Sequence, residues 1–139
     1  MEVNLKSSLH RIFYISQSLS TPDDITRILE TSRRENMVRG ITGALLFTGG
    51  HFAQLLEGDP EFVEETMKRI EADTRHAKVT RLVEGPAETR RFERWSMAFV
   101  DAIDADKAIR DHLLNNATSP GSAERAEALL NLLFEPYFS

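Results

Sequence analysis

The chain has 139 residues, of which 41% are hydrophobic and 28% charged, and its net charge is −5; these values suit one soluble domain with a short appendage and argue against a nucleic-acid-binding surface. It contains no cysteine, which excludes disulfides, thiolate nucleophiles and cysteine-ligated metals. No apolar stretch reaches the roughly 18–20 residues that span a bilayer, and residues 1–10 lack the apolar core of a signal peptide, so we expect a cytoplasmic protein that does not enter a membrane.

A strand and a helix are predicted at the start of the chain. Side chains alternate between two faces over Leu9–Gln17, which is the period of a strand. Thr21 then precedes Pro22, and Asp24 completes a capping-box pattern. We therefore expect a helix from Pro22 to about Met37.

The face of this helix that points inward changes from apolar to polar along its length. It begins with Ile25 and ends with Ser32 and Asn36, at the spacing of one helical face. Two interpretations follow from this pattern. The polar residues lie near a frayed end, or this end of the helix borders a cavity that holds something polar.

A hairpin is the central feature of the sequence. Two apolar strands, Ile41–Thr48 and His51–Glu57, flank Gly49-Gly50, a pair that is typical of a tight turn. Gln54 is a primary amide in the middle of the second strand. A buried amide without hydrogen-bond partners costs about 1–3 kcal/mol, so we expect Gln54 to have a specific partner.

Further helices and strands are predicted in the rest of the chain. Asp59-Pro60-Glu61 is a second helix start, and that helix extends to about Asp73. Two strands and two more helices complete the prediction, at Lys78–Glu84, Arg94–Asp101, Asp104–Asn115 and Ala123–Phe134.

These elements predict an α+β protein with the order βαββαββ. This is a ferredoxin-like arrangement, with a mixed sheet and two helices on one face. Because several strands are apolar on both faces, we expect the two C-terminal helices to cover the other face or to pack against a second subunit. We expect one domain over residues 9–101 and an extension over 102–139 that is not an independent domain.

The sequence shows no pattern typical of a catalytic or metal site. Its four histidines have no metal-ligand spacing, and there is neither a nucleophile elbow nor a phosphate-binding glycine loop. Because the first and third strands of a ferredoxin-like sheet are neighbours, Tyr14 and Gln54 can lie side by side. Each of these residues, taken alone, can be an ordinary core residue. Taken together, they predict a slot that suits a planar heterocycle with imide edges. The full set on this side of the sheet is Tyr14, Asn36, Gln54, Trp95 and Met97.

Several motifs, taken in order, resemble one known family. They are Arg11–Ser16 (RIFYIS), Ser32–Asn36 (SRREN), Gly40–Gly43 (GITG), Phe52–Gly58 (FAQLLEG), Asp73–His76 (DTRH) and Arg91–Met97 (RFERWSM). One such motif alone is weak evidence, but the ordered set over residues 9–101 is specific. The chain resembles the BLUF family of blue-light-sensing, FAD-binding domains, in a short form with C-terminal helices.

The resemblance implies a non-covalently bound FAD, for which FMN or riboflavin can substitute, between the two helices and the sheet. Asn36 would hydrogen-bond the pyrimidine edge of the flavin, and Gln54 would lie between the flavin and the Tyr14 hydroxyl. The other cofactor-binding residues that it implies are Ser32, Asp73, Arg75 and His76. From the residues alone, the last two can also be cations favoured by a helix C-terminus. A second polar contact that some family members make is not carried over, because Glu35 occupies that position.

The family's mechanism gives a role to each photoactive residue. Tyr14 would pass an electron and then a proton to the excited flavin, and Gln54 would relay the proton and then rotate or tautomerise. The hydrogen bonds at the flavin C4 carbonyl and N5 then change, which implies a small red shift that decays in the dark. Trp95 and Met97, on the last predicted strand, are the expected signalling path into the tail.

The main prediction is therefore a photoreceptor without substrate turnover. We expect no output domain after residue 139, and we therefore expect the protein to signal through a downstream protein or through its own assembly. The aromatic end of the tail, Phe134–Phe138, predicts a homo-oligomer. Two alternatives stay open: a ligand-free ferredoxin-like binding module, and an acylphosphatase-like hydrolase. The hydrolase would need an anion-binding glycine loop, which Ile15–Ser20 lacks.

Overall fold

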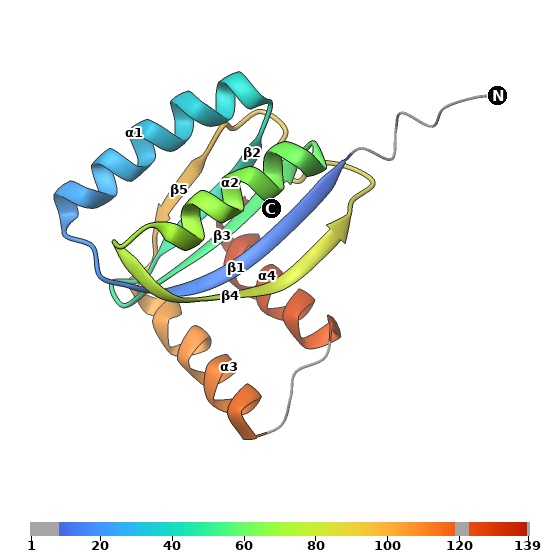
Figure 1. The fold of residues 1–139 in the computed structure, drawn as a ribbon. Helices are drawn as coiled ribbons and strands as arrows, with labels where there is room; N and C mark the ends of the chain where they lie inside the picture. The colour runs from blue at the N-terminus through green and yellow to red at the C-terminus, as the bar shows by residue number, and fades with distance from the viewer. Residues whose placement is uncertain (1–8, 119–122, 139) are drawn as a thin grey trace.

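The structure is a computed structural model that describes residues 9–118 and 123–138. A five-stranded sheet lies between two layers of helices (Figure 1). In chain order the elements are β1 (His10–Ser18), α1 (Pro22–Arg39), β2 (Thr42–Phe47), β3 (His51–Gly58), α2 (Pro60–Ala72), β4 (His76–Pro86), β5 (Ala98–Asp101), a 3₁₀ turn (Ile103–Ala105), α3 (Asp106–Thr118) and α4 (Ala123–Phe138). The strand order is β4-β1-β3-β2-β5. All neighbouring strands are antiparallel except β2 and β5, which are parallel.

The helices are divided between the two faces of this sheet (Figure 1). Helices α1 and α2 lie on one face, and α3 and α4 lie on the other. The predicted α+β class, the ferredoxin-like arrangement and the position of the C-terminal helices are therefore confirmed.

Local sequence signals set the helix ends where they were expected. The Thr21 side chain accepts a hydrogen bond from Asp24 N, and the Asp24 carboxylate accepts one from Thr21 N, which completes the capping box. Asp59 caps α2 by accepting from the backbone N–H of Glu61. Helix α1 ends at Gly40, whose φ of +69° lies in the left-handed region that glycine adopts without strain.

The predicted hairpin brings β2 very close to β3. A Cβ at position 43 would lie 1.9 Å from the carbonyl oxygen of Leu55, so only glycine allows this pairing. Strand alternation then sorts the core into two clusters. Phe13 and Leu55 face α3 and α4, whereas Tyr14 and Leu56 face α1 and α2.

The last predicted strand is shorter than expected. It was predicted over Arg94–Asp101, but β5 begins at Ala98. The carbonyls of Ser96 and Met97 accept hydrogen bonds from side chains of α1, and the register of β5 with β2 begins only at Ala98. The alternation predicted for Trp95 and Met97 on one strand face is therefore wrong.

The aromatic end of the tail also differs from the prediction. Phe134 is 0% exposed, and its ring makes edge-to-face contacts with Phe13 and Phe92. Its burial in the protein's own core removes Phe134 as an argument for an oligomer. The side chains of Tyr137 and Phe138 lie outside the described residues.

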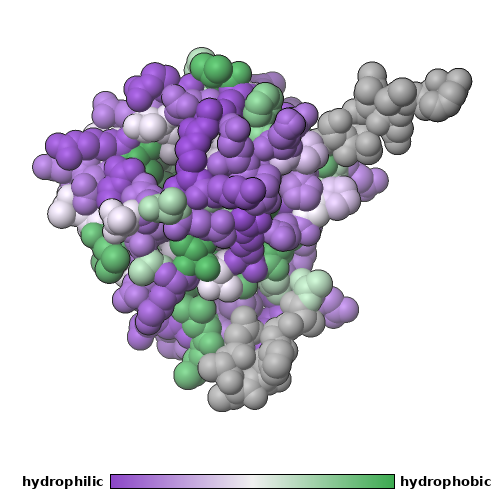
Figure 2. All heavy atoms as spheres, in the orientation of Figure 1, coloured by the Kyte–Doolittle hydropathy of each residue, from purple (hydrophilic) through white to green (hydrophobic). Residues whose placement is uncertain are grey.

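The surface seen from the side of α1 and α2 is mainly hydrophilic, with hydrophobic side chains in separate spots (Figure 2). Within the described ranges, no helix has both the length and the apolar character needed to cross a bilayer. The same ranges contain no group of three or more histidine or carboxylate side chains that could hold a metal ion.

Candidate functional site

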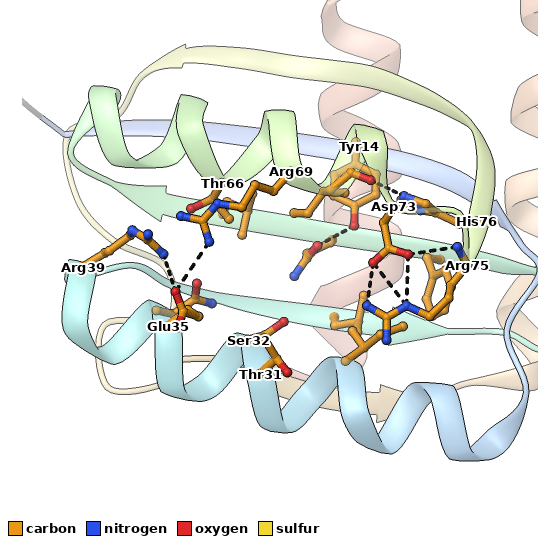
Figure 3. A pocket seen from close by; sticks show the side chains of 17 residues that line it. Tyr14, Thr31, Ser32, Glu35, Arg39, Thr66, Arg69, Asp73, Arg75 and His76 are labelled. Atoms are coloured by element: carbon orange, nitrogen blue, oxygen red, sulfur yellow. Dashed lines mark hydrogen bonds and ion pairs between the residues drawn. The ribbon is translucent and has the colours of Figure 1, made fainter.

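A cavity lies between α1 and α2, with the central strands as its floor (Figure 3). Its volume of about 250 Å³ is close to the lower end of the range for small-molecule sites, about 300–1,000 Å³. The seven residues predicted to bind a cofactor all line it: Tyr14, Ser32, Asn36, Gln54, Asp73, Arg75 and His76. The tertiary structure thus brings these seven residues, from β1, α1, β3, β4 and the loop before β4, to a single site.

A chain of hydrogen bonds forms the floor of the cavity. Tyr14 and Gln54 are directly opposite each other on β1 and β3. The Tyr14 hydroxyl donates to Gln54 Oε1 at 2.5 Å, and Gln54 Nε2 donates to Met97 Sδ at 3.3 Å. All three side chains are buried, so this chain is screened from solvent.

The phenol of Tyr14 is held in its protonated form. Burial raises the pKa of Tyr14 well above its usual value, and the negative charge of Asp73 acts in the same direction. A protonated phenol has a hydrogen to donate, which agrees with the hydrogen bond to the amide oxygen of Gln54.

One end of the cavity carries a charged pair and a histidine. Arg75 and Asp73 form an ion pair of 2.6 Å, and the hydrogen bonds from Arg75 lower the pKa of Asp73 below its usual value. His76 has Nδ1 2.8 Å from Ser16 Oγ and Nε2 2.5 Å from the carbonyl oxygen of Ile70. Arg75 and His76 therefore have specific partners at the cavity, beyond an interaction with the α2 dipole.

At the other end, polar side chains connect the two helices. Glu35 pairs with Arg39 at 2.9 Å on α1 and with Arg69 of α2 at 3.5 Å. Asn36, the next residue, is buried and donates through Nδ2 to the carbonyl oxygen of Ser96 at 2.8 Å. The amide oxygen of Asn36 is the part of this side chain left to meet a ligand.

Met97 and Trp95 lie in different environments. Met97 is 2% exposed and touches Gln54, whereas Trp95 is 48% exposed and is not part of the cavity lining. Of the two residues predicted to signal, Met97 is the one that accepts a hydrogen bond from Gln54.

Sequence reasoning missed several residues of the cavity. Glu35, Arg39 and Arg69 bring opposite charges to its rim, and no periodic pattern along one helix could show that they meet. Thr66 of α2 also lines the cavity and was not among the predicted site residues. Its hydroxyl oxygen is buried and, among the described side chains, is the one such atom without a hydrogen-bond partner. The other lining residues not predicted as site residues are Ile28, Thr31, Leu45, Phe52, Leu56 and Ile70.

Comparison with known proteins identifies the family. A family model described as sensors of blue light using FAD (BLUF) matches residues 9–98, more than half of the chain. This chain belongs to the BLUF family. It is therefore a member of a family of flavin-based blue-light photoreceptors, and the resemblance drawn from its motifs is confirmed.

Two curated BLUF relatives are much longer than this chain. The blue light- and temperature-regulated antirepressor BluF of Escherichia coli is 39% identical over 77 residues, which are 55% of this chain and 19% of the relative. The photoactivated adenylate cyclase subunit beta of Euglena longa is 27% identical over 122 residues, or 84% of this chain and 14% of the relative. The chain thus spans less than a fifth of either protein.

Two solved BLUF structures are close to this chain in size. The dark-state structure of BlrB has a TM-score of 0.70 and 30% identity, covering 92% of this chain and 98% of BlrB. The photo-activated state of BlsA has the same TM-score and 30% identity, covering 90% of this chain and 94% of BlsA. BLUF membership leaves no support for the acylphosphatase-like hydrolase or the ligand-free module.

Proposed function

We propose that this chain is a blue-light photoreceptor that binds FAD without a covalent bond, with the isoalloxazine ring in the cavity between α1 and α2. The residues present fit such a group. Apolar walls from Ile28 and Ile70 suit the faces of a planar ring, and the amides of Asn36 and Gln54 suit its polar edge. The unpartnered hydroxyl of Thr66 beside the cavity is further support for a polar ligand.

The observation that carries the proposal is the hydrogen-bond chain from Tyr14 through Gln54 to Met97. The flavin, when bound, supplies the absorption of blue light and an excited state that accepts one electron. Tyr14 is the electron donor, and its hydroxyl proton has a direct acceptor in Gln54 Oε1. Gln54 can both accept and donate, so it can relay this proton and then change its orientation or tautomer.

The return of the electron and the proton to Tyr14 leaves its phenol as it began. What persists is the altered Gln54, whose Nε2 no longer donates to Met97 Sδ. We propose that this lost contact is the first step of the output. The chain then has no substrate of its own, and light changes how it contacts a second copy or a downstream protein.

FAD is the flavin we propose, and FMN and riboflavin are expected to substitute for it. The cavity of about 250 Å³ has room for a ring system but not for a whole dinucleotide, so the lining residues recognise the part that the three flavins share. A structure of BlrP1 from Klebsiella pneumoniae, which is 28% identical to this chain, is described as a complex with FMN. That complex supports FMN as an alternative ligand.

The test is an absorption spectrum of the purified protein before and after blue light. We expect a yellow protein whose flavin band shifts slightly to the red and returns in the dark. Tyr14→Phe and Gln54→Leu should abolish the shift and keep the flavin. Tyr137→Phe, which changes the only other tyrosine of the chain, is the matched control and should keep the shift. A colourless protein that takes up no added flavin would contradict the proposal.

A further inference from the structure

The connection between β4 and β5 joins the two faces of the sheet. Because β4 and β5 are the two edge strands, this connection has to cross one end of the sheet (Figure 1). Phe92 lies in the core that faces α3 and α4, and its ring contacts Phe134 of α4. Met97, five residues later, lies in the opposite core with Tyr14. One short segment, residues 90–97, therefore touches both α4 and the photoactive pair.

Glu57 holds one end of this segment. Its carboxylate is on the same strand as Gln54 but on the opposite face of the sheet, and the residue is 2% exposed. Oε2 accepts from the backbone N–H of Arg91 at 2.5 Å, and Oε1 accepts from the backbone N–H of Phe92 at 2.9 Å. The Thr42 hydroxyl donates to Oε1 at 3.1 Å. A buried carboxylate that accepts from two successive backbone donors fixes the backbone at that point.

The other end of segment 90–97 is held by β2 and α1. Three successive carbonyl oxygens accept hydrogen bonds: Trp95 O from Gly43 N at 3.1 Å, Ser96 O from Asn36 Nδ2 at 2.8 Å, and Met97 O from Arg33 Nε at 3.0 Å. Between these two anchors the segment has little freedom. The position of Met97 Sδ against Gln54 thus depends on both of them.

We infer that Glu57 is a positioning residue that keeps Met97 against Gln54 and thereby sets the lifetime of the light-induced state. The inference rests on the proposed photoreceptor function. Glu57 lines neither the cavity nor its rim, so it acts through segment 90–97. When the Glu57 anchor is loosened, Met97 moves more freely, and Gln54 returns to its dark arrangement more quickly.

Glu57→Gln tests this inference with little change in shape. A carboxylate has two acceptor oxygens, whereas an amide has one and places an NH₂ where the other oxygen was. If the amide oxygen keeps Phe92 N–H and the Thr42 hydroxyl, the NH₂ faces the N–H of Arg91 and that hydrogen bond is lost. We expect dark recovery to become about 3- to 10-fold faster, which lies in the lower part of the range of coupling between residues that share a network.

A readout that does not depend on photochemistry is the methyl NMR signal of Met97 in the flavin-loaded dark protein. We expect Glu57→Gln to move or broaden this signal and to leave that of Met67, which is buried in the same core, unchanged. Glu64→Gln is the matched control, because it makes the same change of charge and disrupts the ion pair with Arg81, whereas its printed contacts include no residue of segment 90–97. It should change neither the Met97 signal nor the recovery rate.

A Met97→Ala background tests whether Glu57 acts through Met97. In that background, Glu57→Gln should have no further effect on recovery. An equal acceleration there, or an unmoved Met97 signal, would overturn the inference. If Glu57→Gln does not fold, Thr42→Val removes one donor to the carboxylate and should show the same effects in weaker form. Absence of any photoshift in the wild type would instead refute the proposed function, while the Met97 signal could still be read.

Discussion

The hydrogen bond between Tyr14 and Gln54 can be measured in the flavin-free protein. Tyr14→Phe removes the hydroxyl and leaves the buried Gln54 Oε1 without its donor. Gln54→Leu removes the acceptor and leaves the buried hydroxyl without a partner. A buried polar group that loses its partner costs about 1–3 kcal/mol, so each variant should lower the free energy of unfolding by that amount.

The double variant, Tyr14→Phe with Gln54→Leu, should cost less than the sum of the two single variants. Replacing both partners by apolar groups leaves no buried polar group without a partner, and such a change often has little effect on the free energy of unfolding. We therefore expect a coupling free energy of about 1–2 kcal/mol between the two positions.

Urea unfolding followed by circular dichroism is the assay. With a slope of about 2 kcal/mol per molar urea, each single variant should lower the midpoint by roughly 0.5–1.5 M. The double variant should have a midpoint close to that of the less stable single variant. Additivity within about 0.5 kcal/mol would mean that the two side chains are not hydrogen-bonded in solution, and the floor of the site would need another description.

Two further predictions concern the C-terminal helices. Phe134→Ala should lower the free energy of unfolding by about 3–5 kcal/mol in urea, because the ring is fully buried against Phe13 and Phe92; a loss below 1 kcal/mol would mean that this end of α4 is not part of the core. Burial and the positive charge of Arg125 lower the pKa of His112 below its usual value, so as pH falls through about 6.5 the unfolded chain binds a proton that the folded chain does not. The melting temperature should therefore fall from pH 7 to pH 5.5, and His112→Gln should flatten this dependence; equal slopes in the two proteins would contradict the reasoning.

Signals between neighbouring residues predicted most of the fold. The capping box of Thr21 and Asp24 and the Gly49-Gly50 turn each act within a few residues, so the sequence shows them directly. Strand alternation placed Tyr14 and Gln54 on one face, and the ferredoxin-like order made their strands neighbours. The division of the chain at residue 101 remains a prediction.

The sequence by itself thus determined the order of the elements, the face on which Tyr14 and Gln54 lie, and the family. Only the tertiary structure decided that Met97 meets Gln54 while Trp95 is half exposed, and that Glu57 anchors the segment between β4 and β5. The reason is distance along the chain: these partners are 34 to 43 residues apart and meet only once the sheet has formed. A periodic pattern reports which face a residue is on, but not which remote group it touches there.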